Sequence, residues 1–188
     1  MTERTGRYGE VFYVDLARCT GCFTCIVACK DSADLPDSVD WMRVERNETG
    51  RYPNVRIAFR VMHCFHCQRP ACLEACPVSA IARDAEGWVQ IDGEVCTGCG
   101  ACVTACPFGA VALGTDGIAT KCDGCHDEVT AGIGPTCVRA CPMRALAYGP
   151  PEGVDRPRVP DAAWDDHGIG PRVWYAVRRG AEEERRDG

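Results

Sequence analysis

The sequence predicts an α+β fold of short strands and short helices. Three observations lead to this prediction. All 16 cysteines of the 188-residue chain fall into four compact groups, which need short connecting elements. Short apolar and β-branched runs lie before, between and after the groups, as is typical of strands. Clusters rich in Gly, Asp and Asn separate paired runs and indicate tight turns.

The cysteine groups define the first feature of the chain. The most regular one reads C-T-G-C-G-A-C-V-T-A-C-P from Cys96 to Pro107. This is the bacterial ferredoxin run, in which three cysteines bind one [4Fe–4S] cluster and the fourth binds a neighbouring cluster. In chain order, groups I to IV are Cys19, Cys22, Cys25 and Cys29; Cys64, Cys67, Cys72 and Cys76; Cys96, Cys99, Cys102 and Cys106; and Cys122, Cys125, Cys137 and Cys141.

Two other uses of cysteine fit this spacing less well. Disulfide scaffolds rarely place so many cysteines in short runs. Zinc ribbons use two pairs per ion and lack the trailing C-x3-C-P. We therefore expect four [4Fe–4S] clusters, with iron as the only metal. The run Cys64-Phe65-His66 invites a Rieske interpretation, but no second half follows and Cys67 completes the cubane pattern.

Several polar side chains stand beside the cysteines. We expect His63, His66 and His126 to lie near clusters as hydrogen-bond donors, or at the surface. Group I ends in Cys29-Lys30, whereas the other three groups end in Cys-Pro, where proline turns the chain. Lys30 is therefore either a positive charge beside a cluster or a solvated lysine.

The expected elements follow in chain order. The run Val11–Asp15 predicts a strand that leads into group I, and Ile26–Lys30 a helical turn that carries Cys29. Three predicted hairpins follow, each made of two strands and the turn between them. They are Trp41–Arg46 and Val55–Val61 with the turn Asn47–Gly50; Ala80–Ala82 and Trp88–Ile91 with the turn Asp84–Gly87; and Ala110–Leu113 and Ile118–Lys121 with the turn Gly114–Gly117. Leu146–Tyr148 is predicted as a last strand outside these hairpins.

Spacing and flanking strands both bear on how the four cysteine groups pair into modules. Group spacing permits I with II and III with IV. It also permits II with III, joined by a strand–turn–strand link over Pro77–Val95, and I with IV outside them. In a two-cluster ferredoxin the strand before the first group pairs with the strand after the second. The isolated strands Val11–Val14 and Leu146–Tyr148 therefore favour I with IV.

The predicted architecture is two nested bacterial-type two-cluster ferredoxin modules. Residues 1–62 with 107–150 form the outer module, which has a hairpin insertion at about 40–61, and residues 63–106 form the inner module. Residues 151–188 form an irregular, proline-rich tail. In this tail, Val173–Val177 is expected to pack on the body or on a partner, and Glu182–Asp187 to be disordered.

Composition restricts the partners. The formal net charge is −6 and no basic patch occurs, which disfavours nucleic acid. Met1–Glu10 is polar, Arg4 and Arg7 are not adjacent, and no apolar run approaches the roughly 18 residues of a membrane span. We expect no targeting signal and no direct membrane insertion, so that membrane attachment would come from another subunit.

The expected chemistry is electron transfer alone. A cluster bound by four cysteines has no open iron for a substrate, so its chemistry is one-electron transfer. The sequence has no nucleotide-binding glycine fingerprint, no P-loop and no convincing acid–base pair. No catalytic residue is predicted, and the chain is not expected to be an enzyme by itself.

A family resemblance lies in four stretches. They are Tyr13-Val14-Asp15 before C-T-G-C-F-T-C-I-V-A-C-K, Cys64-Phe65-His66-Cys67, K-C-D-G-C from Lys121, and C-V-R-A-C-P-M-R-A-L-A-Y-G-P from Cys137. In order and spacing, residues 8–150 resemble the four-cluster iron–sulfur subunit of the dimethyl sulfoxide reductase family of molybdopterin oxidoreductases. That family includes thiosulfate, polysulfide and tetrathionate reductases and some formate dehydrogenases.

The resemblance implies which cysteines hold each cluster. Every set joins three cysteines of one group to the fourth of its partner group. The implied sets are Cys19, Cys22, Cys25 and Cys141; Cys64, Cys67, Cys72 and Cys106; Cys96, Cys99, Cys102 and Cys76; and Cys122, Cys125, Cys137 and Cys29. Some relatives replace a group III cysteine and carry a three-iron cluster, but this chain keeps all four.

The resemblance also implies a function. The chain would relay single electrons between a large molybdopterin subunit, containing Mo or W, and a membrane quinone-binding subunit or another redox partner in anaerobic respiration. It would lie in the cytoplasm or at the membrane through its partners, and export with a twin-arginine partner is compatible with the family. The alternative is a free polyferredoxin carrier, or a ferredoxin-like component of a hydrogenase or formate dehydrogenase.

Overall fold

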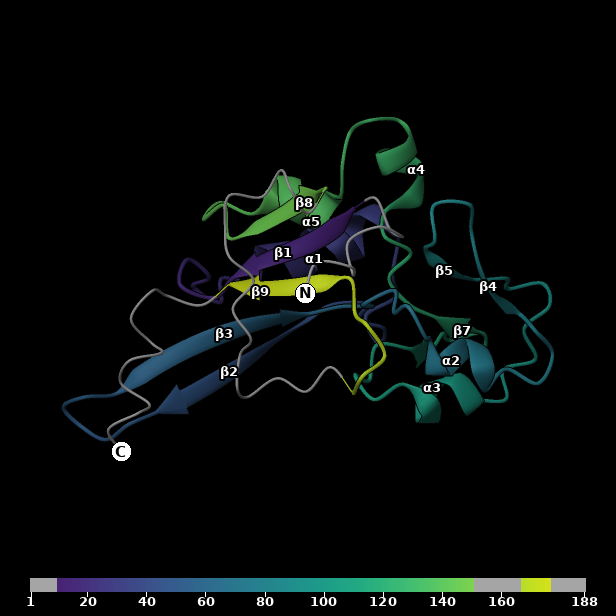
Figure 1. Cartoon of the computed structure of the whole chain (residues 1–188), viewed down its shortest axis with the longest axis horizontal. Coiled ribbons are helices and arrows are strands. Elements are labelled where there is room, and N and C mark those ends of the chain that lie inside the picture. Colours follow the sequence, from purple (N-terminus) through teal and green to yellow (C-terminus); the bar gives the residue numbers. More distant parts are fainter. Residues whose placement is uncertain (1–9, 151–166, 177–188) are drawn as a thin grey trace.

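The centre of the fold is a three-stranded sheet built on the first strand. The computed structural model describes residues 10–150 and 167–176. In Figure 1, β1 (Val11–Asp15) lies between β8 (Leu146–Gly149) and β9 (Val173–Ala176). β8 pairs with β1 antiparallel, with Val14 opposite Leu146, and β9 pairs with it parallel. The predicted pairing of the strands that flank groups I and IV is therefore present.

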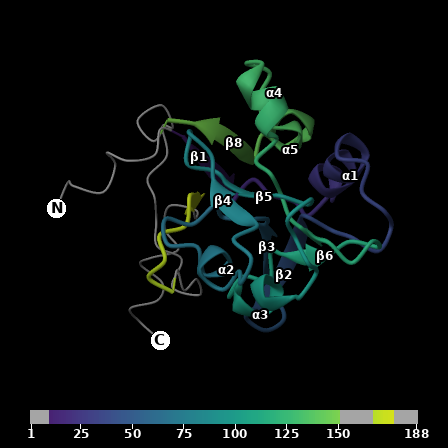
Figure 2. The same cartoon turned by 90° about the vertical axis from the view of Figure 1, so that its right-hand side faces the viewer.

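Three helices lie beside this sheet and carry groups I and IV. They are α1 (Thr24–Ser32), α4 (His126–Thr130) and α5 (Thr136–Ala140). α1 and α5 are in contact, so that segments more than a hundred residues apart in the sequence lie side by side (Figure 2). The predicted helical turn at Ile26–Lys30 is the middle of α1, which is longer at both ends.

A long hairpin extends from the sheet region. β2 (Arg43–Thr49) and β3 (Arg56–Met62) pair antiparallel along their whole length (Figure 1). The predicted turn at Asn47–Gly50 is wrong, because β2 continues to Thr49 and the chain reverses between Gly50 and Val55. The reversal includes Pro53, which cannot donate to a strand ladder. A Cβ on Gly50 would lie 2.2 Å from the carbonyl oxygen of Asn54, so only glycine fits this turn.

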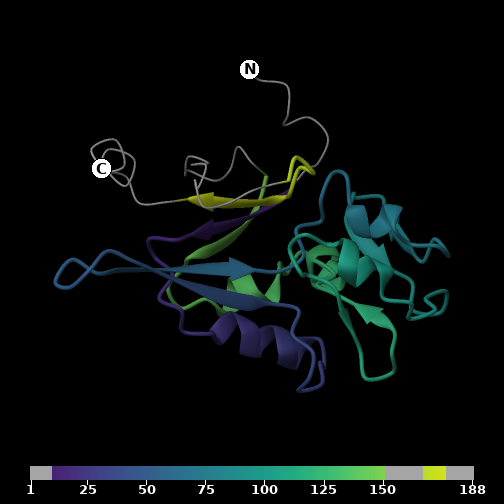
Figure 3. The same cartoon turned by 90° about the horizontal axis from the view of Figure 1, so that it is seen from below.

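The remaining elements carry groups II and III and lie at the opposite end from the hairpin tip (Figure 3). β4 (Ile81–Arg83) pairs with β5 (Val89–Ile91), and β6 (Ala112–Leu113) pairs with β7 (Ala119–Thr120). The short helices α2 (Ala71–Glu74) and α3 (Ala101–Ala105) contact each other. These elements match the predicted hairpins, with small differences at the strand ends.

The tail does not remain irregular throughout. Its residues 173–176 form β9, which the sequence predicted only as a packing segment. Just before β9, the carbonyl oxygens of Ile169 and Gly170 accept the N–H groups of Arg69 and Gln68 at 3.0 and 2.8 Å. The described part of the tail therefore joins the β1 sheet to the loop of group II. Val177 and Glu182–Asp187 lie outside the described residues.

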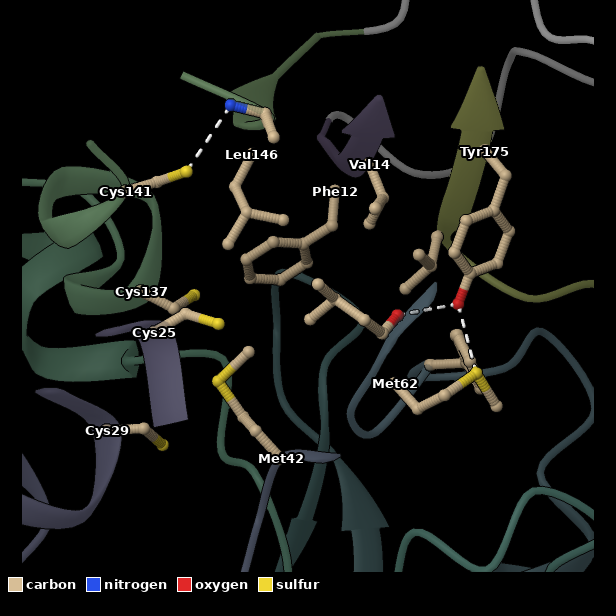
Figure 4. Packing of buried hydrophobic residues seen from close by; sticks show 14 of the residues in the cluster. Phe12, Val14, Cys25, Cys29, Met42, Met62, Cys137, Cys141, Leu146 and Tyr175 are labelled. Atoms are coloured by element: carbon tan, nitrogen blue, oxygen red, sulfur yellow. Dashed lines mark hydrogen bonds between the residues drawn. The ribbon is translucent and has the colours of Figure 1, made fainter. Parts of the chain in front are cut away.

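Two apolar clusters form the core. The larger surrounds Phe12 and Val14 and includes cysteines of groups I and IV, as Figure 4 shows. In the same view the hydroxyl of Tyr175 donates to the carbonyl of Val61 at 2.8 Å, which fixes β9 to β3. The smaller cluster contains Val89 and Ile81 together with cysteines of groups II and III. Among the described residues, every helix is too short or too polar to cross a bilayer.

Candidate metal centres

The structure gathers the cysteines around four pockets, each lined by four of them. We name each pocket by the group that supplies three cysteines. The group I pocket has Cys19, Cys22, Cys25 and Cys141; the group IV pocket Cys122, Cys125, Cys137 and Cys29; the group II pocket Cys64, Cys67, Cys72 and Cys106; and the group III pocket Cys96, Cys99, Cys102 and Cys76. These sets are the same ones that the family resemblance implies as ligands.

The exchange between groups I and IV follows from local structure. Cys25 and Cys29 lie four residues apart on α1, on one face of the helix and about one turn from each other. Cys25 lines the group I pocket and Cys29 the group IV pocket, so one helix separates two adjacent sites. Cys141 follows α5 and faces the group I pocket, where its Sγ accepts the N–H of Ala145 at 3.3 Å (Figure 4).

The pockets form a row in the order I, IV, II, III. Burial raises the pKa of Cys29 to about 12, and the neighbouring charges of Cys125 and Cys25 contribute to the rise. Burial also raises the pKa of Cys122 well above its usual value, and Cys64 is the largest electrostatic contributor. Cys25 and Cys29 on α1 line the group I and group IV pockets, and Gly124 of the group IV loop lies near His66, which lines the group II pocket. The group IV pocket therefore lies beside both the group I and the group II pocket. Groups II and III meet in the smaller core cluster, where Cys72 and Cys102 are buried together.

Exposure differs along the row. Cys22 in the group I pocket and Cys99 in the group III pocket are exposed. No cysteine of the two middle pockets is exposed; most are buried, and Cys106 and Cys125 are half-buried. The two ends of the row therefore approach solvent, and the middle is shielded by protein.

The donor set fits an iron–sulfur cluster. Four thiolates around one point are the ligands of a [4Fe–4S] core and, less specifically, of zinc. Burial raises the pKa of Cys25 and of Cys72 to about 11 each, so these thiolates need a cationic centre to become stable. Backbone N–H groups also point at sulfur: Ala80 donates to Cys76 at 3.2 Å, and Ala110 donates to Cys106 at 3.4 Å. Such bonds are typical of the surroundings of cluster thiolates.

The group IV pocket is distinguished by acidic neighbours. Asp123, Asp127 and Glu128 line it together with Phe12 and His63. Asp123 has a local structural role, because its Oδ1 accepts the N–H of Cys125 at 2.8 Å. Burial is the main cause that raises the pKa of Cys125, and the negative charges of Asp123 and Glu128 raise it further. Negative charge beside a cluster disfavours its reduced form.

The histidines occupy three different environments. Nδ1 of His63 lies 2.8 Å from the carbonyl oxygen of Cys64, and this ring lines the group IV pocket. His66 is fully buried and lines the group II pocket. His126 is more exposed, and its Nδ1 lies 3.4 Å from Oδ2 of Asp84. None of the three belongs to a four-cysteine set.

Two lysines beside cysteines behave differently from each other. Lys30 directs its Nζ into the following loop, where it donates to the carbonyl of Val39 at 2.8 Å and pairs with Asp40 at 2.9 Å. It is therefore a loop-stabilising residue. Lys121 is only 4% exposed, and sequence reasoning assigned it no role. Its position directly before Cys122 was visible in the sequence, but spacing alone does not show where such a side chain points.

Comparison with known families defines the class of protein. Residues 55–150 match the family described as "4Fe-4S dicluster domain", and residues 16–34 match "4Fe-4S binding domain". The first match contains groups II, III and IV, and the second contains group I. The chain is thus an iron–sulfur protein with ferredoxin-type [4Fe–4S] domains.

Curated relatives narrow the class to a family. The protein is 43% identical over 155 residues to the B subunit of the anaerobic dimethyl sulfoxide reductase of Escherichia coli strain K12, covering 78% of this protein and 75% of that one. It is 38% identical over 153 residues to "Thiosulfate reductase electron transfer subunit PhsB" of Salmonella typhi, covering 79% of each. It is 37% identical over 147 residues to "Protein NrfC" of Escherichia coli strain K12, covering 76% and 65%. The chain belongs to this family of iron–sulfur subunits of the dimethyl sulfoxide reductase type.

Proposed function

We propose that this chain relays single electrons through four [4Fe–4S] clusters. The redox partners would be a molybdopterin catalytic subunit and a membrane quinone-binding subunit or another carrier. The observation that supports this function most strongly is the row of four pockets with exposed cysteines only at its two ends. A row of sites that is shielded in the middle and open at both ends suits transfer between two separate partners.

We further propose that the four cysteines of each pocket hold one cluster. Cys29, Cys76, Cys106 and Cys141 would each bind in the pocket of the partner group. When bound, a cluster supplies one-electron transfer and no substrate site. The protein contributes burial, backbone N–H donors to sulfur and nearby charges, which together set the potential of each site.

The nested arrangement of two ferredoxin modules is part of the same proposal. Residues 1–62 and 107–150 would form the outer module and residues 63–106 the inner one. Pairing of β1 with β8 supports the outer module, since these strands flank groups I and IV. Contact between α2 and α3 supports the inner module, since these helices carry cysteines of groups II and III.

The proposed partners rest on the relatives. Two relatives are named as a component of dimethyl sulfoxide reductase and an electron transfer subunit of thiosulfate reductase. By analogy, this chain would be a non-catalytic subunit that assembles with a larger reductase chain, and it would reach a membrane only through a partner. The substrate of that reductase would be defined by the catalytic chain and not by the residues described above.

The experiment compares the isolated chain with its complex. A tagged chain is purified anaerobically from its native host, co-purifying chains are identified, and viologen-linked reductase activity is assayed with sulfoxide, thiosulfate and polysulfide. We expect a larger molybdopterin-containing chain to co-purify. The isolated chain should accept electrons from dithionite but turn over none of these substrates above background. Turnover by the chain alone would refute the relay, and purification without a partner together with rapid exchange with soluble enzymes would favour a free carrier.

A further inference from the structure

Three buried side chains that carry polar atoms lie at the junction between the group IV and group II pockets. The side chains are His66, Trp88 and Lys121, which are 0%, 3% and 4% exposed. The rings of His66 and Trp88 meet edge to face with centroids 4.8 Å apart. A Cβ on Gly124, which lies between Cys122 and Cys125, would be 3.4 Å from Trp88 and 3.7 Å from Nε2 of His66. The group IV loop therefore packs directly against this junction.

His66 carries an N–H that has no partner among the residues that the structure describes. Its Nδ1 accepts the backbone N–H of Val89 at 3.1 Å, so the proton of the neutral ring lies on Nε2. Within residues 10–150 and 167–176, Nε2 is buried and makes no hydrogen bond. A buried donor without an acceptor is destabilising. The ring lines the group II pocket, and Nε2 lies near Gly124 of the group IV loop, so a cluster bound at this junction would be the acceptor of this N–H.

Lys121 brings a positive charge to the same place. Its Nζ donates to the carbonyls of Val89 and Cys122, the latter at 3.1 Å. In the part of the chain that the structure describes, no carboxylate forms an ion pair with it. Lys121 precedes a group IV cysteine in the sequence, yet its Nζ bonds the carbonyl of Val89, a residue that lines the group II pocket.

We propose that Lys121 and His66 are redox-tuning residues of the group II site. The positive charge of Lys121 and the free N–H of His66 would stabilise the reduced form of the cluster held there. This proposal rests on the function proposed above. Reduction adds one electron and no proton to a cluster site, so the reduced site is more negative by one charge. A nearby cation and a hydrogen-bond donor both favour that state and raise the potential.

The effect would matter because this junction joins the two halves of the row. An electron that leaves the acidic group IV surroundings must enter the inner half at the group II site. A potential raised by Lys121 would make that site a ready acceptor. Lys121 thus lies next to group IV in the sequence but would act on the group II site, which is its neighbour in space.

The test is a redox titration of the whole chain with its clusters, monitored by paramagnetic resonance. In Lys121→Met, the reduction equilibrium of the group II site should shift about tenfold toward the oxidised form, which is about 59 mV for a one-electron couple. Lys121→Arg keeps the charge and should retain most of the wild-type potential. His66→Phe keeps an aromatic ring against Trp88 and removes the Nε2–H, so it should shift the same site in the same direction by a smaller factor.

Controls separate tuning from damage and from failure of the proposed function. Lys30→Met removes another lysine beside a cysteine, but that side chain points into its own loop, so the group II signal should stay unchanged. Cys67→Ser identifies the group II signal. If wild-type protein lacks that signal, the relay itself fails. If the signal is present, three results would each overturn the tuning proposal. The potential of the group II site could stay unchanged in both Lys121→Met and His66→Phe, or it could shift equally in Lys121→Met and Lys121→Arg. The third such result is a shift of potential that is confined to another site. If Lys121→Met loses iron, His66→Phe decides by the same criteria.

Discussion

The end pockets and the middle pockets of the row each contain four cysteines, but in different surroundings. The group I and group III pockets each contain an exposed cysteine, Cys22 and Cys99. In the group IV pocket, burial raises the pKa of both Cys122 and Cys137 well above the usual range. In the group I pocket, hydrogen bonds from Thr24 lower the pKa of Cys22 instead. The same cysteine motif is thus exposed to solvent in the end pockets and shielded from solvent by protein in the middle pockets.

The physical reason lies in which elements cover each pocket. The group IV pocket is walled by Phe12 of β1, by α1 and by the segment that leads into α5. The group III pocket is covered mainly by short hairpin strands and by its own cysteine loop. A Cβ on Gly98 in that loop would lie 2.4 Å from the carbonyl oxygen of Gly117, so the β6–β7 turn can approach the loop only because of this glycine. Short strands and loops leave a cysteine of the group III pocket exposed, whereas the sheet and the nine-residue helix α1 cover the cysteines of the group IV pocket.

The largest expected effect comes from removing a cysteine that crosses between pockets. Cys29→Ser should abolish or convert the group IV site, because Cys29 lines that pocket, and should leave the group I site nearly intact. Paramagnetic resonance of the reduced variant should resemble that of Cys122→Ser. If the spectra instead match those of Cys19→Ser, group I is self-contained and the nested arrangement is wrong.

A smaller effect should follow from opening a middle pocket. Phe12 is 3% exposed and lines the group IV pocket, so Phe12→Ala should cost about 3–5 kcal/mol of stability. It should also make the group IV site lose iron faster in ferricyanide, as an end site does. Denaturant unfolding and timed iron release measure the two effects.

Phe23 provides the matched control for Phe12. It is 52% exposed and lines the group I pocket, so Phe23→Ala should change stability by less than about 0.5 kcal/mol. Equal losses of stability in the two alanine variants would remove the distinction between middle and end pockets.

The smallest effect concerns charge beside a middle pocket. Asp123→Asn keeps an oxygen that can accept the N–H of Cys125 and removes one negative charge from the group IV surroundings. The potential of that site should rise by less than about 60 mV, since a tenfold change in equilibrium is about 59 mV. Asp116→Asn is the control, because Asp116 accepts the N–H of Ile118 in a similar turn and lines none of the four pockets. A fall in potential for Asp123→Asn, or equal shifts in both variants, would contradict the electrostatic account.

Much of this arrangement was predictable from residues alone. Cysteine spacing located all four groups, and the isolated apolar runs at Val11–Val14 and Leu146–Tyr148 predicted the antiparallel pair of β1 and β8. Both inferences rest on short-range patterns that a few residues determine completely. The sets of cysteines that line the pockets were implied only by the family resemblance.

Other features depend on contacts that spacing does not encode. β9 is four residues long and pairs in parallel with a strand more than 150 residues away, which no local pattern predicts. Lys30 and Lys121 both adjoin cysteines, but one side chain points into a loop and the other into a buried junction. The reversal after β2 falls later than the polar run Asn47–Gly50 suggested, because the strand ladder continues to Thr49.

The central claim is that all four pockets hold a [4Fe–4S] cluster, and metal analysis tests it most directly. Anaerobically purified protein should be brown and should contain about 16 iron and about 16 acid-labile sulfide per molecule, four of each for every four-cysteine pocket. Metal and sulfide are measured on the same sample with protein quantified by amino-acid analysis. Stoichiometric zinc without labile sulfide, or iron for only two clusters after full reconstitution, would contradict the account.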